Sequence, residues 1–128
     1  MNTPTRIVSV ALAAAALASP ALPASASSTD VVRRGSCSLN ADWKLKASPE
    51  NGRIQVEGEV DSNKVGQSWN WRIVHNGSLS ASGTATTTAP SGSFEVRRLL
   101  VNLAGSDSIV FRAHNPKSDE TCRGSLTF

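Results

Sequence analysis

Residues 37–47 read CSLNADWKLKA, and apolar and polar side chains alternate along this stretch without a break. Every second residue of a β-strand points to the same side, so the pattern predicts a strand with one buried face. The residues predicted to point inward are Cys37, Leu39, Ala41, Trp43, Leu45 and Ala47. Nothing downstream shows a sustained helical period, so this stretch sets the expectation for the whole domain.

The same period of two continues toward the C-terminus between short runs of turn residues. Further strands are predicted at about 53–60, 68–73, 79–88, 94–103, 109–113 and 122–128. Asn76-Gly77 indicates a type I′ hairpin, because both turn residues must adopt positive φ. About seven short strands at this spacing predict an all-β, antiparallel sandwich over residues 37–128.

The N-terminal segment is typical of an export signal. Arg6 precedes an uninterrupted apolar run at residues 7–18, and Ala24-Ser25-Ala26 fits the small-residue motif of signal peptidase. We therefore expect a cleavable signal-peptide helix at 1–26, a flexible arm at 27–36 and a secreted protein. The apolar run is shorter than the roughly 20 residues that a membrane-spanning helix needs, so we expect no membrane anchor after cleavage.

Composition narrows the classes of function. Thirteen Lys and Arg residues against ten Asp and Glu residues give a net charge of +3, and loss of Arg6 with the leader leaves about +2. That balance does not favour nucleic-acid binding, which requires a clustered basic face. The two cysteines, Cys37 and Cys122, are predicted to form a disulfide that joins the first strand to the last, because an exported protein folds in an oxidising compartment.

Two stretches resemble known β-sandwich families. Trp71, in the segment WNWRI, lies where immunoglobulin-like and fibronectin-type-III-like domains place a core tryptophan, and residues 103–113 resemble the corner and sixth strand of these folds. The chain has no tyrosine, so it lacks the tyrosine corner. The resemblance implies an immunoglobulin-like sandwich, although the disulfide would join different strands from those joined in antibody domains.

The whole chain is also similar to small exported proteins of actinobacteria that have no assigned function. The resemblance rests on the Ala-rich leader, GSC at 35–37, WKL at 43–45 and CRG at 122–124. It implies no catalytic or binding residue, and a shared fold does not by itself imply a function.

The sequence offers few residues for catalysis. His75 and His114 are the only histidines, and each precedes a turn, so both are predicted to be solvated at strand ends. A nucleophilic triad and a zinc site each lack part of their residue set. Two pairs of carboxylates could serve a glycosidase, but nothing around them indicates a pocket, so they are predicted to be solvated. These pairs are Glu57 with Glu59 and Asp119 with Glu120. We therefore expect no enzyme, no cofactor and no metal, although a cleft that gathered either histidine with a carboxylate would favour a small exported enzyme.

The remaining expectation is a monomeric, non-catalytic binding or interaction module for an extracellular protein or a cell-wall glycan. Loops at 61–66, 89–93 and 115–121 are the candidate contact surfaces. The residues singled out there are Asp61, Asn63, Lys64, Ser91, Asn115, Lys117 and Asp119.

Two alternatives stay open: an inhibitor of an extracellular enzyme such as a protease, and a cell-wall carbohydrate-binding module. The second would need a tryptophan on the surface to stack on sugars. Trp43 and Trp71 are predicted to lie in the core, whereas the exposure of Trp69 is left open.

Overall fold

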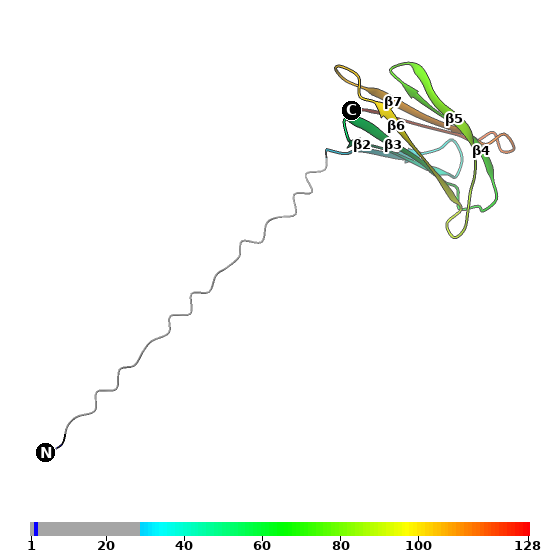
Figure 1. Cartoon of the computed structure of the whole chain (residues 1–128). Helices are drawn as coiled ribbons and strands as arrows, with labels where there is room; N and C mark the ends of the chain where they lie inside the picture. Colours follow the sequence, from blue (N-terminus) through cyan, green and yellow to red (C-terminus); the bar gives the residue numbers. More distant parts are fainter. Residues whose placement is uncertain (1, 3–28) are drawn as a thin grey trace.

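The computed structural model describes Asn2 and residues 29–128, so the predicted signal peptide lies outside the described residues apart from Asn2. Eight antiparallel strands in residues 29–128 form two sheets, β1-β2-β3-β6 and β5-β4-β7-β8, which Figure 1 shows as the two layers of a sandwich. The strands are β1 (Val31–Ser36), β2 (Asp42–Glu50), β3 (Arg53–Asp61), β4 (Ser68–His75), β5 (Ser78–Thr86), β6 (Ser93–Val101), β7 (Ser108–His114) and β8 (Thr121–Thr127). The prediction of an all-β antiparallel sandwich is confirmed. Within the described residues, no helix has the length and apolar character needed to cross a membrane.

The core lies between the sheets and is filled by alternate residues of each strand, as the period of two predicts. Ile54, Val56 and Val60 of β3 are fully buried, as are Ile109 and Phe111 of β7. Their neighbours along each strand point to solvent or lie half-buried at the surface. Because the inward residues fill the core, the outer face of each sheet is the one that remains available for contacts.

Two of the three tryptophans lie in this core, and the third packs against it. Trp69 is 0% exposed and Trp71 is 5% exposed, so the open question about Trp69 is settled in favour of burial. Trp43 is half-buried and packs against the core between two glycines. A Cβ atom added to Gly35 or Gly124 would lie 2.7 or 2.4 Å from the Trp43 ring, so both positions need a residue without a side chain.

The N-terminal part of the domain differs from the sequence prediction. The prediction of a flexible arm is wrong for Val31–Ser36. These residues form β1, which pairs with β2 from Val31↔Ala47 to Ser36↔Asp42. Residues 37–41 were predicted to begin the first strand but form a bend, in which Leu39 is 59% exposed. Strand β2 then continues to Glu50, and the turn after it consists of Asn51 and Gly52, both with positive φ. The extra strand β1 raises the number from about seven to eight.

A disulfide joins Cys37 and Cys122, as predicted. Cys122 lies in β8, but Cys37 lies in the bend after β1 and not within a strand. The buried carboxylate of Glu120 accepts hydrogen bonds from the backbone N–H groups of Leu39 and Ala41 at 3.0 and 2.8 Å. The bend is therefore attached to the start of β8 by the disulfide and by these two hydrogen bonds.

Candidate functional site

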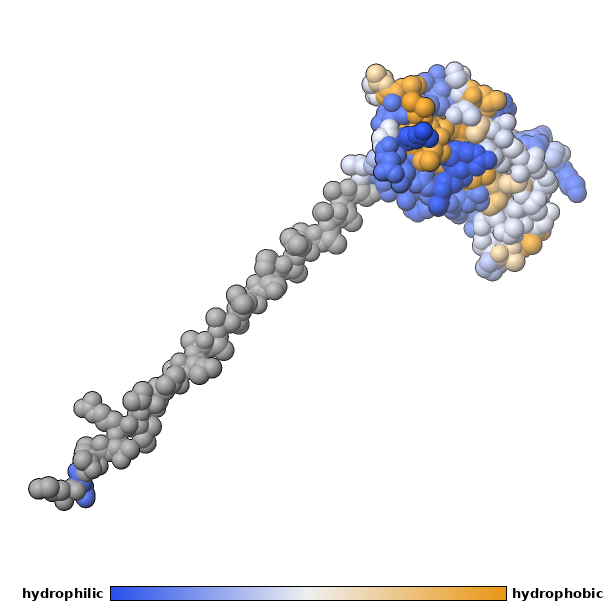
Figure 2. All heavy atoms as spheres, viewed as in Figure 1, coloured by the Kyte–Doolittle hydropathy of each residue, from blue (hydrophilic) through white to orange (hydrophobic). Residues whose placement is uncertain are grey.

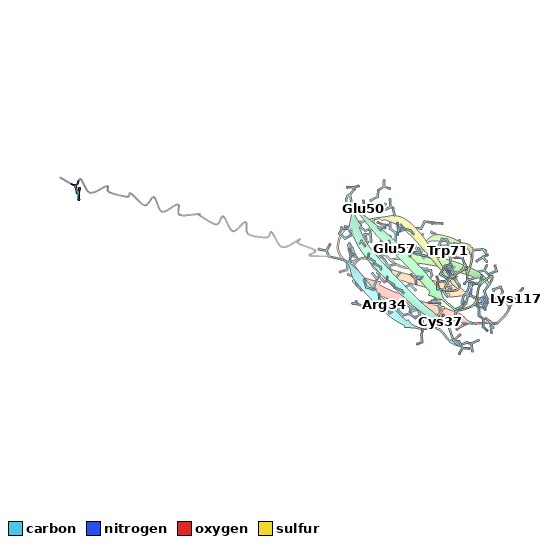
Figure 3. The ribbon with its side chains drawn as sticks, turned by 90° about the horizontal axis from the view of Figure 1, so that it is seen from below. Arg34, Cys37, Glu50, Glu57, Trp71 and Lys117 are labelled. Carbon is cyan, nitrogen blue, oxygen red and sulfur yellow. A yellow bond between two sulfur atoms is a disulfide. The ribbon has the colours of Figure 1, made fainter. Side chains whose placement is uncertain are left out.

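The three predicted contact loops lie together at one end of the sandwich. They follow β3, β5 and β7, which all end on this side, and the bend at 37–41 lies beside them. Figure 3 shows Lys117 at this end of the domain and Glu50 near the opposite end. The candidate contact residues therefore come from loops at the same end of the domain.

Two of these loops are attached to each other by hydrogen bonds. The hydroxyl of Thr87 donates to the backbone oxygen of Lys64 and accepts from the backbone N–H of Gln67 at 2.9 Å. Ser62 donates from its backbone N–H to the oxygen of Gly92 at 3.0 Å. A Cβ atom at Gly92 would lie 2.3 Å from the backbone nitrogen of Lys64, so the loops pack without space for a side chain there. The two loops are therefore closely packed against each other at this end of the sandwich.

The predicted contact residues differ in exposure. Five are exposed, and these are Asn63, Lys64, Ser91, Lys117 and Asp119. Asp61 is half-buried at the end of β3, and its carboxylate accepts from the backbone N–H of Asn63 at 3.1 Å. Asn115 is 3% exposed, and its side-chain oxygen accepts from the N–H groups of Lys117 and Ser118. Asn115 therefore shapes its own loop and is not positioned to contact a partner.

Both histidines lie beside a carboxylate. His75 Nε2 is 2.6 Å from Asp107 Oδ1, and the two side chains are 10% and 1% exposed, so the prediction of a solvated His75 is wrong. His114 Nε2 is 2.8 Å from Asp119 Oδ1, and these side chains are open to solvent. Within residues 29–128, neither imidazole forms a hydrogen bond with a serine, threonine or cysteine side chain. Each is a two-residue pair without the nucleophile that a triad requires.

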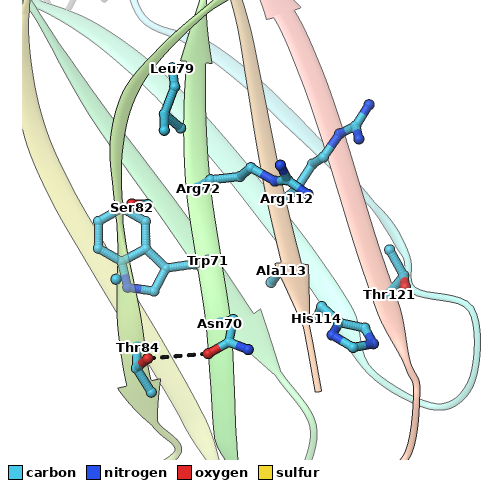
Figure 4. Close-up of a pocket in the computed structure, with 11 residues that line it drawn as sticks. Asn70, Trp71, Arg72, Leu79, Ser82, Thr84, Arg112, Ala113, His114 and Thr121 are labelled. Atoms are coloured by element: carbon cyan, nitrogen blue, oxygen red, sulfur yellow. Dashed lines mark hydrogen bonds between the residues drawn. The ribbon is translucent and has the colours of Figure 1, made fainter. Parts of the chain in front are cut away.

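A hollow in the described surface lies on the outer face of the β5-β4-β7-β8 sheet. It is an open groove of about 660 Å³. Figure 4 shows Arg72 and Asn70 on β4 beside Arg112 and His114 on β7. The groove is lined by Asn70, Trp71, Arg72, Leu79, Ser82, Gly83, Thr84, Arg112, Ala113, His114 and Thr121. Because Trp71 is almost fully buried, the groove presents polar and cationic groups without an aromatic platform.

Three arginines lie directly opposite one another across this outer face. The register pairs Arg72 of β4 with Arg112 of β7, and Arg112 with Arg123 of β8. Facing residues on neighbouring antiparallel strands have Cα atoms about 5 Å apart. We call Arg72, Arg112 and Arg123 the arginine row. All three are exposed, and none forms an ion pair with any residue in the range 29–128.

A second row of polar groups lies two residues along the strands. It consists of Thr84, Asn70, His114 and Thr121, which face one another on β5, β4, β7 and β8. Thr84 donates its hydroxyl hydrogen to the side-chain oxygen of Asn70 at 3.2 Å, the contact drawn as a dashed line in Figure 4. That contact orients the Asn70 amide so that its N–H groups are left as donors at the floor of the groove. The two rows together offer charged and neutral hydrogen-bonding groups.

The two outer faces of the sandwich differ in their charges. Strands β5, β4, β7 and β8 contain no Asp or Glu, whereas β2, β3 and β6 carry six. On that second face opposite charges lie side by side, as where Lys44 faces Glu59 and Arg97 contacts Glu57 at 2.9 Å. Sequence reasoning missed the arginine row, although residues 62–94 without a single Asp or Glu were a readable signal.

Apolar side chains form a separate exposed feature. Leu99 and Val101 share the outer face of β6 and are 52% and 64% exposed, and Leu103 follows at 45%. Figure 2 shows apolar surface gathered over β6 and the loop after it. This strip lies on the other sheet from the groove, so the two surfaces can be tested independently.

Comparisons with known proteins found no family model, no curated protein and no solved structure that matches the chain. Within the described residues, no three His, Cys, Asp or Glu side chains are gathered closely enough to hold a metal ion. The function is therefore argued from the surfaces described above.

Proposed function

We propose that the protein is an exported, non-catalytic binding module whose ligand lies in the groove on the outer face of the β5-β4-β7-β8 sheet. The observation that carries the proposal is the arginine row, three exposed cations held opposite one another without acidic partners. Like charges that face each other across strands destabilise a sheet. A bound ligand that interacts with the arginines offsets this repulsion.

Several features support the other parts of the proposal. The leader and the Cys37–Cys122 disulfide support export, because structural disulfides persist in oxidising compartments. The absence of a nucleophile hydrogen-bonded to either histidine in residues 29–128 supports a role without catalysis. The naming as an immunoglobulin-like sandwich is supported by Trp71 on β4 and by the order β4-β7-β8, which matches strands C, F and G of such domains.

The proposal is tested by capture with a blocked groove. Ser82 is exposed beside Arg72 on β5, so Ser82→Trp places a large ring in the groove without disturbing the core. The matched control is Ser36→Trp, at an exposed position on β1 of the other sheet. The immobilised full chain is incubated with cell-wall glycans and culture-supernatant proteins. We expect a ligand that the unaltered chain and Ser36→Trp retain and Ser82→Trp loses. Equal retention by all three chains contradicts the proposal, as does turnover in an enzyme screen that Ser82→Trp abolishes.

A second candidate function, inhibition of an extracellular protease, is favoured by one observation. The loops around Lys64 and Ser91 are attached to each other by the Thr87 and Gly92 contacts, and inhibitors bind through exposed loops that change little on binding. An inhibition assay across a protease panel tests it. Inhibition that Lys64→Ala weakens, and that Ser82→Trp leaves unchanged, would assign the loop end instead of the groove as the binding surface.

A further inference from the structure

Resting on the proposed function, we infer the class of its ligand: an acidic polysaccharide whose oxyanions are bound by Arg72, Arg112 and Arg123. The inference begins with the chemistry of the arginine side chain. Guanidinium groups donate paired, parallel hydrogen bonds that match carboxylate and sulfate groups, and they keep their charge at any physiological pH. Three guanidinium groups in a line across three strands form a cationic strip. Such a strip is suited to a polymer that carries a negative charge on successive units.

The arrangement of charge on the two faces makes this strip specific. On the face of β1-β2-β3-β6 basic and acidic side chains are mixed, as where Arg97 contacts both Glu57 and Glu95. A polyanion approaching that face meets carboxylates as well as cations. On the opposite face, the strands carry arginine and histidine with no acidic residue. The residues that line the groove include no Asp or Glu among those the structure describes, and Asp119, from the loop after β7, contacts His114 at its edge.

The groups around the arginine row favour a sugar polymer. Ser82, Thr84, Asn70 and Thr121 present hydroxyl and amide groups beside the arginines along an open groove. Sugar hydroxyls both donate and accept hydrogen bonds, and these side chains can do the same. The groove is open to solvent and its lining residues come from all four strands of the sheet, so part of a longer chain can lie in it and continue beyond it.

Two other macromolecules fit this face less well. Proteins that bind single-stranded nucleic acid stack bases on exposed aromatic rings, but Trp69 and Trp71 are buried and Trp43 packs against the core. Protein interfaces concentrate their affinity in buried aromatic and apolar anchors, and the only large apolar side chain that is exposed in the groove is Leu79. An acidic polysaccharide needs neither a stacking ring nor an apolar anchor.

The test uses the full chain, purified with its disulfide formed, and four defined polymers in a titration by calorimetry. The polymers are polygalacturonate, dextran sulfate, neutral dextran and oligothymidylate. We expect binding to polygalacturonate, to dextran sulfate or to both, weakened by salt as expected for exposed charges, and no binding to neutral dextran. The two acidic polymers distinguish carboxylate from sulfate as the preferred oxyanion.

Two triple variants make the test specific to the face. Arg72→Gln, Arg112→Gln and Arg123→Gln together remove the arginine row. Arg34→Gln, Arg53→Gln and Arg97→Gln remove three arginines from the opposite face, so both variants lose the same net charge. We expect the first triple variant to bind the acidic polymer at least about tenfold more weakly and the second to stay within about threefold of the unaltered chain.

Guanidinium unfolding of each variant accompanies the titrations. The first triple variant is expected to unfold at the same or a higher denaturant concentration than the unaltered chain, so that its loss of binding is not a loss of fold.

Each contrary result has a distinct meaning. Equal weakening by the two triple variants would show attraction by net charge alone and overturn the inference. Binding to neutral dextran, or tighter binding to oligothymidylate than to the acidic polymers, would also overturn the inference. Capture of a ligand that Ser82→Trp abolishes would still support the proposed binding module. Absence of binding to both acidic polymers overturns the inference. The proposed function is decided separately, by the capture experiment and the enzyme screen described above.

Discussion

Replacing both Cys37 and Cys122 by alanine removes the disulfide. The double variant tests whether this bond stabilises the domain by lowering the conformational entropy of the unfolded chain. The bond closes a loop with a sequence separation of 85 residues. In the chain-entropy model, a loop of this length stabilises the folded state by about 4.6 kcal/mol. Small domains have total stabilities of about 5–15 kcal/mol. The double variant is therefore expected to lose a large share of its free energy of unfolding.

The folded structure should survive this change. Glu120 holds the bend at 37–41 through the N–H groups of Leu39 and Ala41. Ser38 and Thr121 add a reciprocal pair of hydrogen bonds at 2.9 and 2.8 Å. Because these contacts do not involve sulfur, the bend stays attached to the start of β8 without the covalent bond. The variant is therefore expected to lose stability because its unfolded chain gains conformational entropy. The tryptophan fluorescence spectrum of its folded state is expected to stay unchanged.

Guanidinium unfolding followed by tryptophan fluorescence measures the effect, since Trp43, Trp69 and Trp71 all pack in or against the core. We expect the midpoint to fall by about 1–2 M, given typical denaturant slopes for a domain of this size. Chemical reduction of the unaltered chain serves as a control and should give the same shift. A loss below about 1 kcal/mol with an unchanged folded spectrum would refute the loop-closure reasoning.

Three further substitutions test the packing, the buried pair and the arginine row. Gly124→Ala brings a Cβ atom to 2.4 Å from the Trp43 ring and should destabilise the domain by about 1–3 kcal/mol in denaturant unfolding, and an unchanged midpoint would contradict the close packing. Asp107→Ala leaves His75 and the backbone N–H of Leu103 without their acceptor and should lower the free energy of unfolding by about 1–3 kcal/mol, whereas a neutral result would mean that water replaces the carboxylate. Arg112→Thr removes the central charge of the arginine row and should raise the free energy of unfolding by about 0.2–1 kcal/mol. A lower free energy of unfolding would show instead that the arginine stabilises the fold.

Strands with one buried face were predictable from sequence. In β3, residues Ile54, Val56 and Val60 alternate with charged and polar side chains, and the structure buries that set. The turn at Asn76-Gly77 was predictable because it depends on local backbone preference, and both residues adopt positive φ. Features that depend on one strand or one turn can be read from a short segment.

Strand β1 was missed because it lacks this alternation. Its inward positions include Arg33, which faces Leu45 from the edge of the sheet and stays exposed, and Gly35, which lies against Trp43. The strand is held by backbone pairing with β2, and backbone pairing leaves no signature in side-chain hydrophobicity. The converse error occurred at Leu39, where an apolar residue in the correct alternation lies in an exposed bend.

The buried carboxylates were missed for a different reason. Glu120 accepts from backbone groups that lie 81 and 79 residues away in the sequence, and Asp107 pairs with His75 across 32 residues. Acidic residues in loops are normally solvated, so a short segment of sequence gives no indication that these two are buried. Only the tertiary fold supplies the donors that make their burial favourable.

The arginine row shows how the fold and the candidate site depend on each other. Arg72, Arg112 and Arg123 are separated along the chain, and each reads alone as an ordinary outward residue of an alternating strand. They face one another only because the register pairs β4 with β7 and β7 with β8 at these positions. A slip of one residue in either pairing would turn the apolar neighbours, such as Phe111 and Ala113, to solvent and the arginines into the core. Burial of the core thus fixes the same register that aligns the arginines, so the proposed binding surface needs no stabilising contacts of its own and can keep three like charges side by side.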